Sequence, residues 1–185
     1  MGQLTPLINR ANQIQDDEIR AVVIQAIYIV PINTWSNRAS RNHHLPDERR
    51  EWGSRLHTCR VFDAAVFISE LYGVSNIQLD IIMAGALIHD IKKFGDHAQY
   101  SYTRDEHPFL VRELVDSINP DFKFKEEILL CVESHMGQWT VVNTEIKPAT
   151  FDDAKNGPMA RIVHLADCLV ARFAEVMGAK EQKRM

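Results

Sequence analysis

Apolar residues recur at three- and four-residue intervals along almost the whole 185-residue chain. This spacing is the period of an amphipathic helix, and no run shows the strict alternation that a half-buried strand requires. Turn-forming residues are sparse, with 8 glycines and 7 prolines that lie mostly between the periodic segments. The sequence therefore predicts an all-α fold, and the length and 45% hydrophobic content suffice for one sizeable core.

Capping and breaking residues indicate where the helices begin and end. We expect a short helix from Thr5, a second helix from about Asp16 to Tyr28, and a polar, irregular segment from Asn33 to Pro46. Further helices are predicted at about 47–72, 76–93, 107–118, 123–136 and 158–177, with a long connection before the last. The predicted organisation is a single domain, with an N-terminal helical extension and loop (1–46), a core (47–177) and a frayed tail (178–185).

Charge and cysteine content exclude several classes of protein. A net charge of −4 disfavours a protein that coats a nucleic acid backbone, so extended nucleic acid is not an expected partner. The 3 cysteines are dispersed and form no CxxC pattern, which indicates reduced core residues and a cytoplasmic protein. No segment approaches the roughly 20 apolar residues that span a bilayer, so we expect no membrane association. The oligomeric state is not indicated.

The pair His89-Asp90 closes an apolar run at 81–88 and carries the strongest functional signal. A histidine and a carboxylate at the end of a buried segment are costly unless they bind something, most commonly a metal ion. Four more candidate ligands lie in helical register with apolar neighbours on their own segments: His57, His107, His135 and Asp167. Five predicted helices would therefore each direct a potential ligand into the same core.

Taken alone, an inward-facing histidine is more often a satisfied core residue than a ligand. Four histidines and two aspartates in phase together favour a metal centre. Imidazole and carboxylate without thiolate suit iron, manganese, zinc, cobalt or nickel. Six ligands exceed the needs of one catalytic ion that keeps open positions, so we predict two divalent ions bridged by Asp90.

These motifs resemble the HD superfamily of metal-dependent phosphohydrolases, whose pattern is a His, a His-Asp pair and a distal Asp on a helical bundle. His57 lies in RLHT, His89-Asp90 in LIHDI and Asp167 in HLAD. The two extra histidines, in EHP and SHMG, resemble those of the binuclear branch. The resemblance implies an HD-domain helical bundle with extra N-terminal helices and two divalent ions, with iron or manganese favoured.

Two features refine this resemblance. Lys92 stands where the family often has the glycine of HD-Ile-Gly-Lys, and no GYP signature of cyclic-di-GMP phosphodiesterases is present. Because the GYP signature is absent, cyclic-di-GMP is not the expected substrate. The segment 35–44 is similar to the one that precedes the core in certain prokaryotic HD proteins, including 3′→5′ exoribonucleases.

By analogy with the family, one ion would be bound by His57, His89, Asp90 and Asp167, and the other by Asp90, His107 and His135. Two such ions would lower the pKa of water and supply hydroxide for in-line attack on phosphorus. Asp90 and Lys93 are the predicted catalytic residues, because Lys93 follows the pair closely enough to stabilise phosphate charge.

For each candidate substrate contact, a purely structural role is the alternative to substrate binding. Lys93 could be a solvated residue at a helix end, and Arg60 could form a surface salt bridge. His164 could support a ligand, act as an acid toward the substrate, or simply occupy a helix face. His43 and His44 lie in the irregular segment, where loops often carry substrate contacts but exposed side chains are common. His97 is the alternative to His107 as a ligand.

The leading functional hypothesis is a phosphohydrolase that acts on a small phosphate ester, with a nucleotide expected. A di-iron oxygenase of the same fold would use the same six ligands, and dependence on O₂ would identify it. A 3′→5′ exoribonuclease is a special case of the leading hypothesis. A non-catalytic nucleotide-binding HD module is the alternative outside the enzymes, and it predicts binding without turnover.

Overall fold

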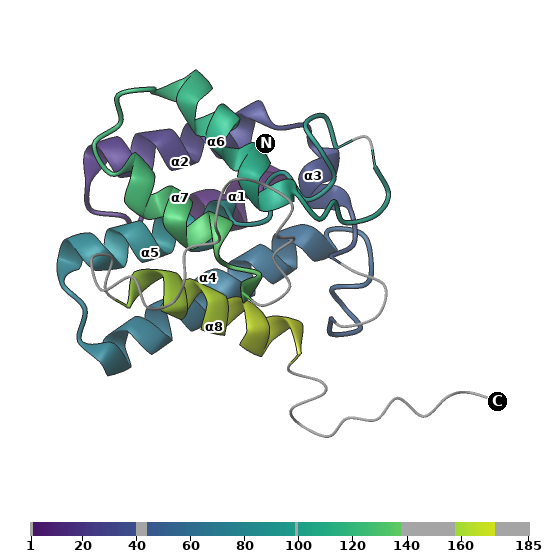
Figure 1. Cartoon of the computed structure of the whole chain (residues 1–185). Coiled ribbons are helices and arrows are strands. Elements are labelled where there is room, and N and C mark those ends of the chain that lie inside the picture. Colours follow the sequence, from purple (N-terminus) through teal and green to yellow (C-terminus); the bar gives the residue numbers. More distant parts are fainter. Residues whose placement is uncertain (1, 40–43, 99, 138–157, 173–185) are drawn as a thin grey trace.

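The computed structural model describes residues 2–39, 44–98, 100–137 and 158–172. These residues form helices and turns with no strand among them, which confirms the predicted all-α fold. In chain order the elements are the 3₁₀ helix η1 (Gly2–Leu4) and the helices α1 (Thr5–Ala11), α2 (Asp17–Ile29), α3 (Asn33–Ser36), α4 (Gly53–Tyr72), α5 (Asn76–Ile88), α6 (His107–Ile118), α7 (Lys125–Glu133) and α8 (Met159–Ala171) (Figure 1).

Helix α5 packs against α1, α2, α4, α7 and α8, and these neighbours give it a central position in the bundle. Every residue from 80 to 88 is buried, so this part of the helix has no solvent-facing side. A helix that is apolar all round is stable only inside a core. The central position explains the uninterrupted apolar run, and it places His89-Asp90, which follows directly, in the interior of the molecule.

The helices that carry the other candidate ligands pack against α5 or against each other. Helix α4 packs against α5 and α8, and α7 packs against α5, α6 and α8. The N-terminal helices α1 and α2 cover α5 from another side, and α1 also contacts α4. The five ligand-bearing segments are thus neighbours in space although they span more than half of the chain.

Helix α4 begins at Gly53 rather than near residue 47, which corrects the sequence prediction. Residues 46–52 form turns, and the backbone N–H of Ala39 donates to the carbonyl of Glu48 at 2.8 Å. Gly53 permits this folding, because a Cβ at that position would lie 1.8 Å from the same Glu48 oxygen. The segment before α4 is therefore folded across the start of the helix instead of extending it.

Three further boundaries differ from the prediction. The segment 33–46 is not irregular throughout, since α3 forms within it and the indole of Trp35 is buried and donates to the carbonyl of Ile27 at 3.2 Å. Helices α5 and α7 end at Ile88 and Glu133, earlier than expected. In each case the residues after the helix form turns that hold site residues.

The apolar register that follows His57 along its segment was expected to face inward as far as Leu71, but Leu71 is 72% exposed. The predicted connection at 138–157, the end of the last helix at 173–177 and the tail at 178–185 lie outside the described residues. Among the helices that the structure describes, none combines the length and apolar character needed to cross a membrane.

Candidate metal centre

All six predicted ligands come together at one place in the core. His57 lies within α4 and Asp167 within α8, while the other ligands lie at helix ends. His89 and Asp90 follow α5, His107 is the first residue of α6, and His135 follows α7. The four histidines are at most 2% exposed and Asp90 is 9% exposed, so each imidazole is removed from water.

One half of the cluster is formed by His57, His89 and Asp167. The Nε2 atom of His57 lies 3.1 Å from Asp167 Oδ1 and 3.4 Å from His89 Nε2. Asp90 Oδ2 is 3.6 Å from His89 Nε2 and 3.8 Å from His57 Nε2. Ligand atoms about 2.1 Å from one ion lie roughly 3.0 to 3.4 Å apart at octahedral or tetrahedral angles, which is close to these separations.

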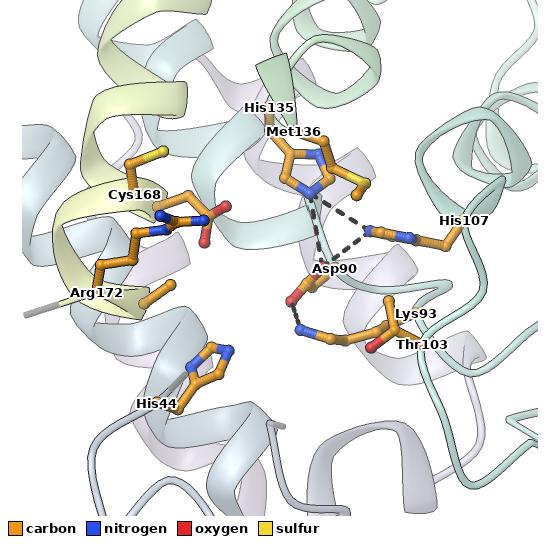
Figure 2. A pocket seen from close by; sticks show the side chains of 11 residues that line it. His44, Asp90, Lys93, Thr103, His107, His135, Met136, Cys168 and Arg172 are labelled. Atoms are coloured by element: carbon orange, nitrogen blue, oxygen red, sulfur yellow. Dashed lines mark hydrogen bonds and ion pairs between the residues drawn. The ribbon is translucent and has the colours of Figure 1, made fainter. Parts of the chain in front are cut away.

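The other half is formed by His107 and His135, and it meets the first half at Asp90 (Figure 2). Asp90 Oδ1 lies 3.0 Å from His107 Nε2 and 3.7 Å from His135 Nε2. The two Nε2 atoms are 3.4 Å apart. The two carboxylate oxygens of Asp90 therefore face two different pairs of histidines, as a bridging ligand requires.

Hydrogen bonds on the far side of three rings fix the protonation of the ligand atoms. The Nδ1 atoms of His89, His107 and His135 lie 2.5–2.8 Å from backbone carbonyl oxygens, each three residues earlier in the chain. A carbonyl oxygen only accepts hydrogen bonds, so these Nδ1 atoms carry the proton and Nε2 presents a lone pair. Facing Nε2 lone pairs cannot bond to each other, but a cation can bind both. The donor set fits a divalent metal.

The pKa values of two of these imidazoles favour the neutral form that binds metal. Burial, together with the neighbouring His89 and His107, lowers the pKa of His135 to about 3. Burial likewise lowers the pKa of His89. Neutral imidazole is the ligand form, so these shifts prepare the histidines for an ion.

The carboxylates of the cluster are held ionised despite their burial. Burial raises the pKa of Asp90, but Lys93, His89 and His107 outweigh it and hold the value well below the usual range. Burial acts in the same way on Asp167, and the hydrogen bond from His57 holds its pKa low. Both aspartates are therefore available as anionic ligands at neutral pH.

A cavity of about 230 Å³ opens beside the cluster (Figure 2). Its walls combine candidate ligands with residues of the surrounding segments. They are His44, Asp90, Lys93, Thr103, His107, His135, Met136, Asp167, Cys168, Ala171 and Arg172. Thr103, Cys168 and Arg172 were not identified from the sequence, and Arg172, five residues after Asp167, lies out of helical phase with it. The cavity gives a small molecule access to the centre.

Two of the predicted substrate contacts line this cavity. Lys93 is 7% exposed, so it is not a solvated residue, and its Nζ atom lies 2.5 Å from Asp90 Oδ2. His44 is 5% exposed, so it does not belong to an exposed loop pair. Burial lowers the pKa of His44 to about 4, although its hydrogen bond to Glu48 acts in the opposite direction.

Two of the remaining predicted contacts, Arg60 and His164, lie outside the cavity lining. Arg60 does not line the described cavity, because its guanidinium pairs with Asp47 and Glu48, as the salt-bridge alternative expected. His164 also lies outside the cavity lining, and its Nδ1 atom is 2.6 Å from the carbonyl oxygen of His135. His43 falls outside the described residues.

His107, and not His97, lies in the cluster of candidate ligands. The His107 side chain is buried against Asp90, whereas His97 is exposed. The helical phase of His107, which places it in register with Val111 and Leu114, was therefore the better guide. Both of these apolar residues are buried.

Sequence reasoning missed Glu48, which is fully buried beside His57. Burial raises its pKa, but the hydrogen bond from His44 and the neighbouring imidazole of His57 lower it below the usual value. The prediction placed residue 48 at the start of a helix from about 47, and helical periodicity gave no signal for it. The proline and glycine that bound the turns, Pro46 and Gly53, were the only hint in the sequence.

Comparison with known proteins gave two matches. Residues 56–172 match the protein family described as HD domain, and this range contains all six candidate ligands. The chain is also 31% identical over 184 residues to the dihydroneopterin 2′,3′-cyclic phosphate phosphodiesterase of Methanocaldococcus jannaschii. That alignment covers 87% of this chain and 66% of the archaeal protein, just under two thirds of its length. No solved structure matches the chain.

Proposed function

Because the chain belongs to the HD domain family, we propose that it is a metal-dependent phosphohydrolase that cleaves a small phosphate ester at the six-residue centre. The observation that carries this proposal is the position of Asp90, whose two oxygens face two separate histidine pairs. The archaeal relative is named as a phosphodiesterase of a cyclic phosphate, which supports the same class of reaction.

The proposed centre holds two divalent ions. His57, His89 and Asp167 would bind one ion together with Asp90 Oδ2, and His107 and His135 would bind the other together with Asp90 Oδ1. Iron or manganese is favoured, because the donor set is imidazole and carboxylate without thiolate. When bound, such ions polarise phosphoryl oxygens and lower the pKa of water so that hydroxide is available at neutral pH. The chain itself fixes the ligand orientation through the Nδ1 hydrogen bonds.

The walls of the cavity suit a compact anionic substrate. The cavity volume of about 230 Å³ is below the 300 to 1,000 Å³ of common drug-sized pockets, which favours a small ester over extended nucleic acid. Lys93 and Arg172 approach the cavity from different sides (Figure 2). Both are cations that can bind a phosphate group. We infer that the substrate is a small phosphate ester of a nucleotide-like or pterin-like molecule, and a cyclic phosphodiester is the first candidate.

Hydrolysis of a cyclic phosphodiester determines which assay is informative. The oxygen of water forms a new bond to phosphorus, one ring P–O bond breaks, and the departing ring oxygen takes up a proton. The product is a phosphomonoester, so inorganic phosphate is not released. A phosphate-release assay alone would therefore miss the expected reaction.

The test combines metal analysis with a direct view of phosphorus. The protein is purified anaerobically, its metal content is measured, and it is reconstituted with Mn²⁺ or Fe²⁺. Nucleoside 2′,3′-cyclic phosphates, pterin cyclic phosphates, mononucleotides and short RNA are then incubated with it without O₂ and followed by ³¹P NMR. We expect metal-dependent opening of a cyclic phosphate to a monoester.

Each competing hypothesis predicts a different result in the same experiment. Product formation only with O₂ would replace the proposal with the oxygenase, and cleavage confined to RNA would replace it with the exoribonuclease. Nucleotide binding without turnover in any condition would indicate the non-catalytic module. A metal content near one ion per chain that does not change in His107→Ala would overturn the binuclear centre.

A further inference from the structure

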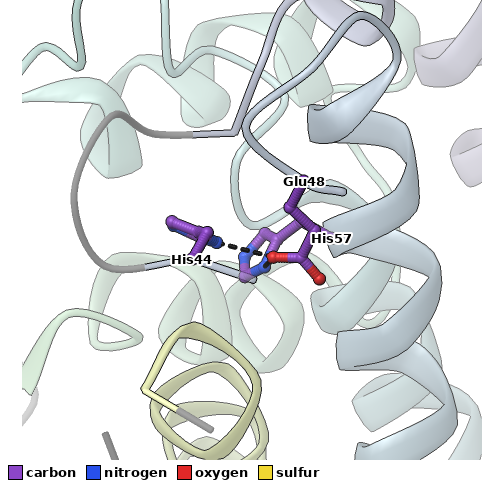
Figure 3. A group of neighbouring side chains, drawn as sticks. All are labelled: His44, Glu48 and His57. Carbon is purple, nitrogen blue, oxygen red and sulfur yellow. Dashed lines mark hydrogen bonds and ion pairs between the residues drawn. The ribbon is translucent and has the colours of Figure 1, made fainter. Parts of the chain in front are cut away.

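A buried carboxylate behind the metal centre contacts two imidazoles and a guanidinium. Glu48 is 0% exposed, and its Oε2 atom lies 2.8 Å from His44 Nδ1 and 3.5 Å from His57 Nδ1 (Figure 3). Its Oε1 atom accepts a hydrogen bond from Arg60 at 2.7 Å. A fully buried carboxylate is strongly disfavoured unless hydrogen-bond donors surround it. The donors around Glu48 offset this cost and hold its carboxylate in a fixed position.

His57 differs from the other three ligand histidines in how its Nδ1 atom is satisfied. The other three rings donate to carbonyl oxygens of their own turn. Among the described residues, His57 Nδ1 is the only buried side-chain nitrogen or oxygen without a hydrogen bond of normal geometry. Glu48 Oε2, at the long limit of a hydrogen bond, is the anion that faces it.

The same three residues could in principle form a separate metal site, because His44, Glu48 and His57 each offer a ligand atom within 4.8 Å of the others. The hydrogen bonds argue against it. Arg60 occupies one oxygen of Glu48 and His44 Nδ1 occupies the other, so an ion would have to displace both donors. The positive guanidinium of Arg60, which is hydrogen-bonded to Glu48, would also repel a metal ion bound to the same carboxylate.

We propose that Glu48 is a positioning residue that accepts hydrogen bonds from the Nδ1–H groups of His57 and His44 and so directs both Nε2 atoms inward. His57 Nε2 then faces Asp167 and His89 as a metal ligand. His44 lines the cavity, and with Nδ1 occupied its Nε2 is the nitrogen that meets the substrate. One carboxylate thereby orients a metal ligand and a substrate contact. This inference rests on the proposed metal centre.

Hydrogen-bond partners of metal-bound histidines fix the ring and raise its basicity, and their loss costs about 10- to 100-fold in metal affinity. Glu48→Gln keeps the shape of the side chain, but its amide group places a donor against either an imidazole N–H or Arg60. The matched control is Asp47→Asn, because Asp47 binds the same guanidinium from an exposed position and does not contact His57.

The experiment is a Zn²⁺ titration of metal-free protein by calorimetry, with circular dichroism as the check on folding. We expect Glu48→Gln to weaken zinc binding about 10- to 100-fold and Asp47→Asn to leave it unchanged. His44→Gln keeps a donor toward Glu48, so zinc affinity should be retained while kcat/KM for the ester falls. This split between metal affinity and turnover is not expected from a residue that only stabilises the fold.

NMR of the zinc-loaded protein with ¹⁵N-labelled histidine provides the direct readout. The wild-type protein should show His57 bound through Nε2 with a proton on Nδ1, and this Nδ1 proton signal should be lost or strongly shifted in Glu48→Gln. If Glu48→Gln does not fold, Glu48→Asp is the second variant. It retains a negative carboxylate for Arg60 but has a shorter side chain, which moves that carboxylate away from His57. It should give an intermediate loss of zinc affinity.

The outcomes separate this inference from the proposed function. Equal zinc affinity in Glu48→Gln and wild type, or a zinc ion bound by His44, Glu48 and His57, would overturn the positioning role and leave the metal centre intact. Failure of the wild-type protein to bind zinc would overturn the metal centre and the inference together.

Discussion

Three of the four site histidines are oriented by the turn to which they belong, whereas His57 depends on a different segment. The rings of His89, His107 and His135 lie at helix ends, where each donates to the carbonyl three residues earlier. His57 lies inside α4, where the preceding carbonyls are used by the helix itself. The backbone can therefore fix a ligand cheaply at a helix end, but a ligand within a helix needs an outside partner.

This difference divides the centre into a half that is set by local geometry and a half that is set by tertiary contacts. The half with His107 and His135 is oriented entirely by backbone carbonyls. The half with His57, His89 and Asp167 combines the locally oriented His89 with His57, which faces Glu48 only because the turns at 46–52 fold across the start of α4. Asp90 belongs to both halves, and its replacement is expected to have the largest effect.

Asp90→Asn should remove the ligand shared by the two halves. We expect kcat/KM to fall at least about 10³-fold, because metal polarisation of phosphate is worth several kcal/mol. Metal content per chain should fall as well, and both quantities are measured on the same preparation. Asp96→Asn is the control, since Asp96 is an exposed carboxylate near the same segment that pairs with Lys92. Full metal content in Asp90→Asn would contradict the bridging role.

Replacing a ligand in one half only should remove one ion and leave the other. We expect His107→Ala and Asp167→Asn each to retain about one metal ion per chain and to lose at least about 100-fold in kcat/KM, the upper cost of losing even an outer partner of a ligand. Metal analysis and steady-state kinetics check both variants. If either substitution removes both ions, the halves are not independent and the comparison fails.

Stability of the metal-free protein should depend on pH in opposite directions for the two halves. Burial lowers the pKa of His57, but the carboxylates of Asp167 and Glu48 outweigh it and raise the value to about 9. Because an unfolded histidine titrates near 6.5, His57 stabilises the fold fully below that pH, and this contribution is lost as pH rises through 9. Burial lowers the pKa of His135 to about 3, so protonation of the unfolded state destabilises the fold as pH falls from 6.5 toward 3.

Urea unfolding between pH 5 and 9 measures this contrast. His57→Gln should flatten the loss of stability above about pH 6.5, and His135→Gln should flatten the loss below it, each by roughly 2 kcal/mol. Wild-type protein without metal is the reference. A shift in the same direction for both variants would show that the two imidazoles do not occupy the different environments described above.

The same division explains how much of the site could be predicted from the sequence. Five of the six candidate ligands were predicted because each lies in phase with apolar neighbours on its own segment, as His107 does with Val111, and Asp90 was predicted because it adjoins His89. The boundary of α4 was wrong because the turns at 46–52 are stabilised by contacts with 36–39 that no local pattern encodes. Glu48 and its hydrogen bond from Arg60 were missed for the same reason. Local periodicity predicts which residues face inward but not which distant side chain supports them.

Gly137→Ala tests whether the locally oriented half tolerates a small change in its backbone. Gly137 follows His135 by two residues and has a φ of +56°, and a Cβ there would lie 2.4 Å from Cε1 of His164. The His164 ring, which contacts the His135 carbonyl, would have to move. We expect unfolding free energy to fall by about 1 to 2 kcal/mol and metal binding by the half that contains His135 to weaken.

Gly73→Ala is the matched control for this prediction. Gly73 has a similar φ of +61° at the end of α4, but a Cβ there would meet nothing within 4 Å. Gly73→Ala introduces the strain of a positive φ but no steric clash. It should therefore lower the free energy of unfolding by about 1 kcal/mol without changing metal affinity. Urea unfolding and zinc titration of the two variants separate strain from displacement of His164. Equal effects in both measurements would show that the His164 contact does not support His135, and the half set by local geometry would then depend only on its carbonyl hydrogen bonds.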